Sequence, residues 1–210
     1  MPRADRQLVG SGDSPATNVR VCLAALRFYP VIAGPAMRFQ RYAPGLRRRG
    51  IDLHVFTCWE PAPGEAFDPA VAQNGGVRSI DEVDGIDVYR AGVPYRKSAR
   101  VWSDYGALLV RHCHDPRTRP AAIQFLALNA WSMPALLRLR RAGIPLVFTQ
   151  TMVRAAPGSR LARTVKDALW RAPLQLMDRI VVSSGAMRDE LLARGLRPSI
   201  DVIPNGVDLA

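Results

Sequence analysis

Short apolar runs alternate with amphipathic stretches along most of the chain. The runs are rich in Val, Ile, Leu and Phe, which is typical of strands that are buried on both faces of a sheet. Turn-forming Gly, Pro, Asn and Asp residues bound many of them, as expected for strands. The pattern predicts strands at residues 19–26, 52–57, 86–91, 121–127, 144–150, 179–184 and 199–203.

Between these runs, apolar residues recur every three or four positions, which is the period of an amphipathic helix. Ser184 and Gly195 mark the start and the end of the last such stretch, because serine caps a helix N-terminus and glycine readily ends a helix. Pro44 weakens the first stretch, and Pro173 is expected to bend or end the fourth. The predicted helices span residues 36–49, 98–114, 131–143, 160–178 and 184–195.

Two segments show neither period. Residues 59–85 are rich in Pro, Gly and acidic side chains, and we expect an excursion with little regular structure. Residues 1–18 are polar and lack the apolar centre of a signal peptide, so they predict a disordered tail. No apolar run approaches the roughly 20 residues that a membrane-spanning helix needs.

The alternation of strands and helices predicts an α/β fold. We expect a single doubly wound, Rossmann-like domain over residues 19–208, with a parallel sheet of six or seven strands and helices on both faces. In such a sheet, ligands bind beyond the carboxyl ends of the strands, where the strand order reverses. The residues that follow each strand are therefore the first candidates for a site.

The charge is strongly positive, at +11, and unevenly spread. Nine bases and no acid lie between Pro116 and Lys166, whereas residues 60–87 carry seven acids and one base. Two explanations remain open: genomic base composition, and an anionic partner such as phosphate, a membrane surface or nucleic acid. Nucleic acid is the weakest of these, because the arginines are dispersed and no recognised binding motif accompanies them.

The cysteines and histidines do not form a recognisable motif. The spacing of the cysteines matches no metal or redox site, so we expect buried free thiols in a reducing cytoplasm. His54 falls inside a predicted strand and is assigned a structural role. His112 and His114 lie at a helix end, where Asp115 is a candidate partner. The cysteines are Cys22, Cys58 and Cys113.

The loop after the first strand, "RFYPVIAGPAMRF" (27–39), is a candidate phosphate site. Gly34 stands where the chain turns into the first helix, and glycine lets backbone N–H groups approach a phosphate there. On this stretch alone, an ordinary strand-to-helix turn is the favoured interpretation. The sequence has neither G-x-G-x-x-G nor a Walker A lysine, so a dinucleotide or P-loop site is not supported.

Three stretches together resemble the amino-terminal half of family 4 glycosyltransferases: "AGPAMRF", "LRRRGIDLHVFT" and "DRIVVSSGAMRDELLARG…DVIPNGVD". They follow the family's order and spacing, and the closing I-P-N-G-V-D is the most specific piece. The resemblance implies the GT-B architecture of two Rossmann-like domains. The second domain holds most sugar-nucleotide contacts and the paired glutamates. We expect it to be absent here, so that the chain is a truncation or one subunit of a split enzyme.

The resemblance implies transfer of a sugar from a nucleotide-sugar donor to a glycan or lipid-linked acceptor, with retention at the anomeric carbon. It implies no cofactor and no required metal. Since the amino-terminal half mainly shapes the acceptor site, we expect inactivity without a second Rossmann domain in cis or trans. The alternative is a non-catalytic module that binds an anionic lipid, a glycan or a partner chain. A cytoplasmic protein is expected, and lipid-linked acceptors would bring it to the inner membrane face.

Carried over by position, Gly34 matches the second glycine of the family's donor-diphosphate loop, and Ala33 replaces the first. Arg38, one turn into the helix, faces either the diphosphate or solvent. The family usually has a histidine where this chain has Thr151. The chemistry therefore falls to Gln150 or Thr151, or the acceptor differs, or activity is lost.

The catalytic residues are left unassigned. The remaining candidates follow other strands or lie in the turn that would lead to the second domain. The acceptor-side candidates are Asn129, Gln150, Thr151 and Ser184, and the interdomain turn is Pro204, Asn205 and Gly206.

The helix predicted at 160–178 has two distinct sides. A basic side that carries Trp170 suits an anionic lipid surface. The favoured interpretation is instead that the apolar stripe packs on the core and the other side is solvated. The stripe comprises Leu161, Val165, Ala168, Leu169, Ala172 and Leu176, and the other side carries Arg163, Lys166, Trp170 and Met177.

Overall fold

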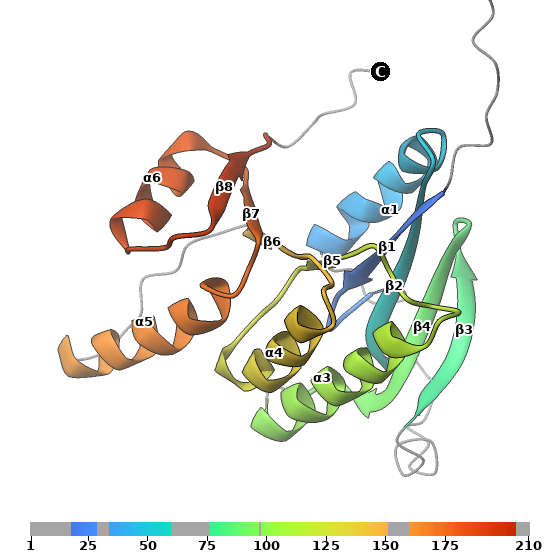
Figure 1. Ribbon diagram of the computed structural model, residues 1–210, viewed down its shortest axis with the longest axis horizontal. Coiled ribbons are helices and arrows are strands. Elements are labelled where there is room, and N and C mark those ends of the chain that lie inside the picture. Colours follow the sequence, from blue (N-terminus) through green and yellow to red (C-terminus); the bar gives the residue numbers. More distant parts are fainter. Residues whose placement is uncertain (1–17, 29–33, 60–75, 97, 151–159, 205–210) are drawn as a thin grey trace, which may run out of the picture.

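The computed structural model describes residues 18–28, 34–59, 76–96, 98–150 and 160–204. Within these ranges the strands form one eight-stranded sheet in the order β3-β4-β2-β1-β5-β6-β7-β8 (Figure 1). The strands are β1 (Val19–Ala24), β2 (Ile51–Trp59), β3 (Val77–Val83), β4 (Ile86–Pro94), β5 (Ala122–Phe125), β6 (Leu146–Gln150), β7 (Arg179–Val182) and β8 (Ser199–Val202). The helices are α1 (Gly34–Arg47), α3 (Ala99–His114), α4 (Met133–Arg141), α5 (Arg160–Leu174) and α6 (Gly185–Ala193), and the 3-10 turn η1 (Ala130–Ser132) precedes α4.

The doubly wound fold is confirmed. From β1 the chain winds outward through β2 to β4, and it then crosses back to β5 on the other side of β1. From β5 it continues in the opposite direction through β6, β7 and β8. Every pair of neighbours in this series is parallel. The point at which the strand order reverses therefore lies between β1 and β5.

The prediction that residues 59–85 hold little regular structure is wrong at its carboxyl end. There, β3 pairs with β4 in an antiparallel hairpin, which gives the sheet one strand more than expected. The connecting residues Asp84 and Gly85 both have positive φ, at 52° and 76°. Two such residues form the turn whose twist matches the flanking strands, and Asp-Gly is a preferred pair for it. The sequence therefore contained the hairpin signal.

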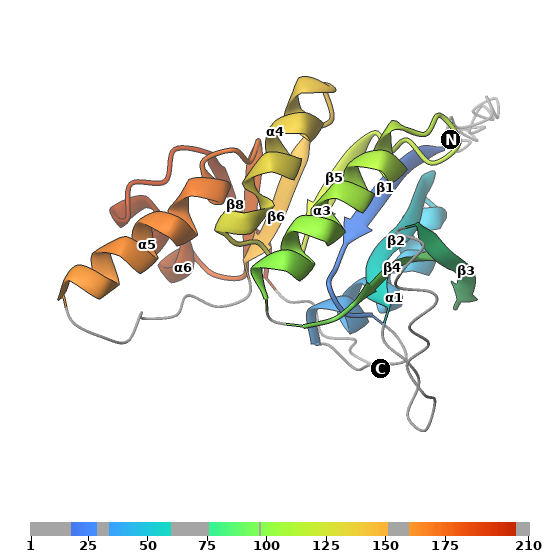
Figure 2. The same cartoon turned by 90° about the horizontal axis from the view of Figure 1, so that it is seen from below.

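Helices cover both faces of the sheet, as predicted, and enclose two buried clusters (Figures 1 and 2). α1 covers one cluster, which includes Leu23, Val55 and Val88. α3, α4 and α5 cover the larger cluster on the opposite face, to which α6 adds Leu191. No helix in the described ranges combines the length and apolarity needed to cross a membrane.

α3 and α4 pack closely at Gly106. A Cβ atom placed there would lie 2.9 Å from the Cβ of Ala135, closer than side-chain carbons normally approach. We expect Gly106→Val to lower the free energy of unfolding by about 1–3 kcal/mol, because overpacking pushes the helices apart. This loss should appear although valine is a better helix former than glycine.

Ala107→Val is the matched control, since residue 107 is exposed on the same helix. Urea unfolding of both variants measures the difference. Equal midpoints would show that the helices tolerate a side chain at this contact.

Candidate functional site at the carboxyl edge of the sheet

The carboxyl ends of β1 and β5 meet at the centre of one sheet edge. The backbone N–H of Leu126 donates to the carbonyl oxygen of Ala24 at 3.1 Å, so the two segments remain joined just beyond the strands. The chain leaving β1 then leads to Gly34 at the start of α1, and the chain leaving β5 leads to Asn129 and η1. This divergence is where doubly wound sheets bind their ligands.

A pocket of about 260 Å³ opens at this edge between η1 and α5. Most of its lining is apolar, and the asparagine amide and the lysine ammonium supply the polar groups. Such a lining suits an apolar ligand with a polar or anionic head. The lining residues are Leu128, Asn129, Ala130, Trp131, Lys166, Leu169 and Trp170.

Asn129 shapes one wall of this pocket. Its backbone is extended, and its side-chain oxygen accepts a hydrogen bond from the N–H of Trp131 at 2.9 Å. This cap starts η1 and fixes the direction in which the chain leaves β5. The amide of Asn129 also carries two N–H donors, and these give the wall a means of binding an oxygen atom. Trp131 follows the cap and is 59% exposed.

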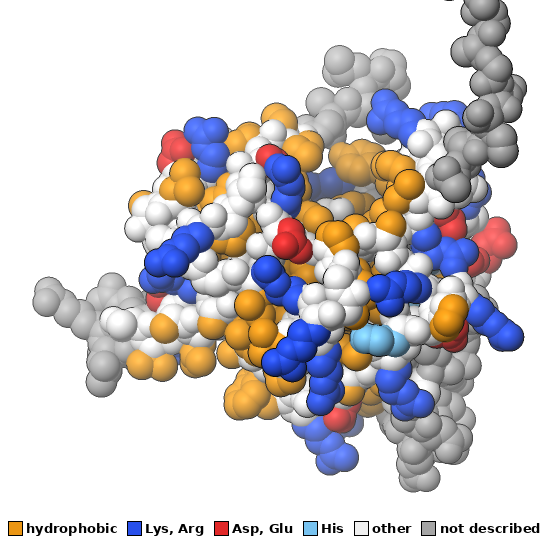
Figure 3. All heavy atoms as spheres, viewed as in Figure 1, with side chains coloured by type: hydrophobic (Ala, Val, Ile, Leu, Met, Phe, Trp, Pro, Cys, Tyr) orange, Lys and Arg blue, Asp and Glu red, His pale blue; other side chains and the backbone are white. Residues whose placement is uncertain are grey.

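α5 forms the opposite wall, and its orientation differs from the favoured prediction. Val165 and Leu169 belong to the stripe that was expected to pack on the core, but they are 50% and 52% exposed. The helix instead buries Leu174 near its end, and Trp170 one turn earlier packs against the same core. Figure 3 shows hydrophobic side chains gathered along α5 at the molecular surface. The apolar stripe is therefore wrongly assigned to the core at these two positions.

Arg194, the residue that follows α6, contacts the indole ring of Trp170. The guanidinium of Arg194 lies 5.4 Å from the centroid of the Trp170 ring, within range of a cation–π interaction. Arg194 also pairs with Asp167 at 3.0 Å and with Glu190 at 2.6 Å. These contacts orient the guanidinium against the Trp170 ring, which lines the pocket.

The described candidates from the sequence all lie at the carboxyl edge. Gly34 begins α1, with Arg38 one turn further on, and Gln150 is the buried last residue of β6. The hydroxyl of Ser184 accepts a hydrogen bond from the N–H of Met187 at 3.3 Å and caps α6, as predicted. Pro204 follows β8 and is exposed.

Four further candidates lie outside the described residues, as do residues 1–17 of the predicted tail and most of the excursion after β2. These four are Ala33, Thr151, Asn205 and Gly206.

Among the candidates, the structure brings Asn129 into the pocket lining. Trp131 was missed as a binding residue, although its position shortly after a strand was the available signal. The described pocket lining contains no histidine, cysteine or carboxylate, and so offers no set of metal ligands.

The strand order and the helices on both faces define a doubly wound, Rossmann-like α/β domain. The sequence matches the model of the glycosyl transferase 4-like domain over residues 33–206. The chain therefore belongs to the glycosyl transferase 4-like family, as the resemblance predicted. No curated protein sequence matches it significantly.

Solved structures share the fold at low sequence identity. A UDP-N-acetylglucosamine 2-epimerase superposes with a TM-score of 0.57 and 14% identity, over 88% of this chain and 48% of that chain. The Neisseria meningitidis UDP-GlcNAc 2-epimerase bound to UDP-GlcNAc superposes with a TM-score of 0.56 and 13% identity, over 88% of this chain and 46% of that chain. A sucrose-phosphate synthase from Thermosynechococcus elongatus superposes with a TM-score of 0.54 and 14% identity, over 90% of both chains. The chain thus spans about half the length of the two epimerase chains.

Proposed function

We propose that this domain is the acceptor-side half of a retaining glycosyltransferase that moves a sugar from a nucleotide-sugar donor to a lipid-linked acceptor. Membership of the glycosyl transferase 4-like family supports the reaction class. The pocket between η1 and α5 is the observation that carries the choice of acceptor. Its apolar walls suit a lipid chain or another apolar aglycone more than a free sugar, whose hydroxyls need many polar partners.

Lys166 gives this pocket a cationic group for the acceptor. A lipid-linked acceptor places a phosphate between its hydrocarbon chain and the sugar or hydroxyl that reacts. An ammonium at the rim of an apolar pocket would bind that phosphate, while the hydrocarbon chain of the lipid lies on Leu169 and Trp170. The same side chains would therefore align the acceptor with the carboxyl edge of the sheet.

The exposed apolar residues beside the pocket support action at a membrane surface. Trp131, Val165 and Leu169 are each at least half exposed, on a chain with a net charge of +11. Apolar and aromatic side chains on a basic protein favour partition to the interface of an anionic bilayer. We infer peripheral binding to the cytoplasmic membrane face, which would deliver a lipid-linked acceptor directly to the pocket.

The donor would bind between this edge and a second Rossmann domain. The backbone N–H groups at the start of α1, beginning with Gly34, would face its diphosphate, since a helix N-terminus favours negative charge. Arg38 would add a charged contact one turn further along. The similar Neisseria meningitidis fold is bound to UDP-GlcNAc, which supports a nucleotide sugar as the donor class.

The test adds a second Rossmann domain to the chain. The chain is assayed alone and then with the second Rossmann domain of a family member, using a panel of labelled nucleotide sugars and a polyprenyl phosphate in vesicles. We expect transfer to the lipid only when both domains are present. Robust transfer by the chain alone would overturn the half-enzyme assignment.

A non-catalytic binding module is the second candidate, because the exposed apolar residues would serve it equally well. The same assay separates the two. Vesicle binding without transfer to any donor–acceptor pair, in the presence of a second domain that is active with its own amino-terminal half, would favour the binding module.

A further inference from the structure

Three metal-ligating side chains converge beneath the last turn of α3, on the face of the sheet covered by α3 and α4. Cys22 and His54 are register partners on β1 and β2, so both side chains emerge on the same face. His112 reaches them from α3. The Cys22 sulfur and one ring nitrogen of each histidine all lie within 4.8 Å of one another. This arrangement joins a helix to two adjacent central strands.

The polar atoms of this cluster are buried without partners. Cys22, His54 and His112 are 0%, 3% and 6% exposed. Both ring nitrogens of His54 and Nε2 of His112 have no hydrogen-bond partner in the described part of the chain. A buried polar atom without a hydrogen bond disfavours folding, so three such atoms in one place require an explanation.

The neighbours of the two imidazoles are other rings. The His112 ring centroid lies 4.5 Å from that of Tyr89, 4.9 Å from that of Phe56 and 5.3 Å from that of His54. Aromatic rings thus surround the His112 imidazole, and in the described part of the chain none of the three unpartnered ring nitrogens forms a hydrogen bond with them.

We propose that Cys22, His54 and His112 bind a zinc ion that fastens α3 to the sheet. Zinc is the metal that buried sites of mixed imidazole and thiolate donors favour, and it requires no redox chemistry. Bonds of about 2.0–2.3 Å place the donors of one tetrahedral zinc roughly 3.3–3.8 Å apart. Small side-chain rotations would bring the three groups to that separation.

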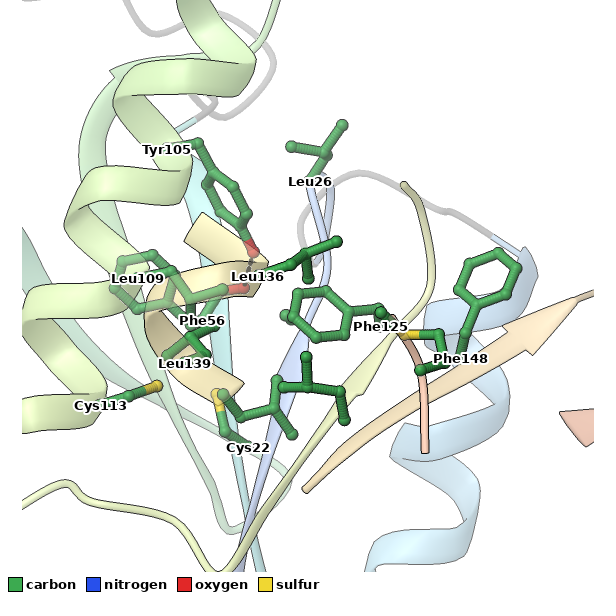
Figure 4. Packing of buried hydrophobic residues seen from close by; sticks show 14 of the residues in the cluster. Cys22, Leu26, Phe56, Tyr105, Leu109, Cys113, Phe125, Leu136, Leu139 and Phe148 are labelled. Atoms are coloured by element: carbon green, nitrogen blue, oxygen red, sulfur yellow. Dashed lines mark hydrogen bonds between the residues drawn. The ribbon is translucent and has the colours of Figure 1, made fainter. Parts of the chain in front are cut away.

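Cys113 is the candidate for a fourth ligand. Figure 4 shows its sulfur atom facing that of Cys22, although Cys113 lies outside the group of donor atoms that are within 4.8 Å of one another. Structural zinc sites are closed by four protein ligands. Two thiolates also balance the charge of Zn²⁺, so the site as a whole would be neutral, which a buried position demands.

Zinc binds the lone pair of a neutral imidazole and the sulfur of a thiolate, so Cys22 would release its proton when the ion binds. The ion would act on stability alone, since the group lies inside the core and outside the pocket lining.

Metal titration of the purified chain tests the site. The chain is freed of metal with a chelator and titrated with Zn²⁺ against a chromophoric competitor, and with Co²⁺ as a spectroscopic probe. We expect one ion per chain with a submicromolar dissociation constant and a raised melting temperature. Cobalt should give the thiolate charge-transfer absorption and the visible bands of a tetrahedral site.

Variants assign the ligands. Cys22→Ala and His54→Phe should each weaken zinc binding by about a hundredfold or more, and the phenyl ring keeps the aromatic packing of His54. His114→Asn is the control on the same helix, because His114 is exposed and lies outside the group. It should bind zinc as the original chain does, and circular dichroism confirms that each variant is folded.

Two results would overturn the proposal. One is a wild-type chain that takes up no zinc at micromolar concentration. The other is binding that Cys22→Ala, His54→Phe and His112→Phe all leave unchanged. If Cys22→Ala does not fold, the two histidine variants decide the question.

Discussion

Leu136→Ala is expected to lower the free energy of unfolding by about 3–4 kcal/mol. Leu136 lies on α4 and is completely buried. Figure 4 shows it between Tyr105 and Leu109 of α3 and Phe125 of β5. Neighbours that belong to three different elements cannot all move inward to fill the space, so the variant keeps much of the cavity. The loss of stability has two parts: less apolar surface is buried on folding, and the side chains around the cavity lose packing contacts.

Leu137→Ala is the matched control, because it makes the same chemical change at the next position of α4, where the side chain is 39% exposed. We expect it to change the stability by less than about 1 kcal/mol. Urea unfolding followed by far-ultraviolet circular dichroism measures both, with the slope of the transition as a check on cooperativity. Equal losses at the two positions would contradict the orientation of α4.

Trp131→Ala is expected to lower kcat/KM for a lipid-linked acceptor by about 10- to 100-fold in the two-domain enzyme, and this prediction rests on the proposed function. The indole lines the pocket and is 59% exposed before the acceptor binds. Covering a large apolar side chain with an apolar ligand is favourable by about 1.5–3 kcal/mol. Each 1.4 kcal/mol corresponds to about a tenfold change, which gives the expected range.

Tyr42→Ala is the control for this experiment. Tyr42 is also an exposed aromatic residue, 40% accessible, but it lies on α1, on the opposite face of the sheet. We expect its removal to leave acceptor kinetics unchanged, and neither variant should alter the KM of the donor. A larger loss from Tyr42→Ala than from Trp131→Ala would move the acceptor site to the other face.

The strands and helices could be predicted because their signals are local. A buried parallel strand needs a continuous apolar run, and a surface helix needs a three-to-four-residue period. The residues of each element are therefore enough to predict it. β3 was missed because the Pro- and acid-rich composition around it outweighed the Asp84–Gly85 pair. Its strand character depends on pairing with β4, and a hairpin is recognised only when both arms are read together.

The orientation of α5 illustrates the limit of a periodic pattern. The sequence predicts that a stripe through Val165 and Leu169 packs on the core, whereas the structure buries the row through Trp170 and Leu174. A helix can present only one of these two rows to the core. The volume and shape of the surrounding elements decide which row is buried, and none of those elements is adjacent in sequence. The exposed row, and with it the pocket wall, therefore became visible only in three dimensions.

The candidate zinc ligands show most clearly which features the sequence determines and which the tertiary structure decides. The sequence alone determined that Cys22 and His54 lie in strands, that His112 lies at a helix end, and that the chain has a doubly wound fold of the glycosyl transferase 4-like family. It gave no metal motif, because the spacing of the ligands along the chain matches none. Only the tertiary structure brought them together, since the register of β1 and β2 and the path of α3 across the sheet set which side chains meet. Register and crossover are fixed by long-range packing, which residue spacing does not encode.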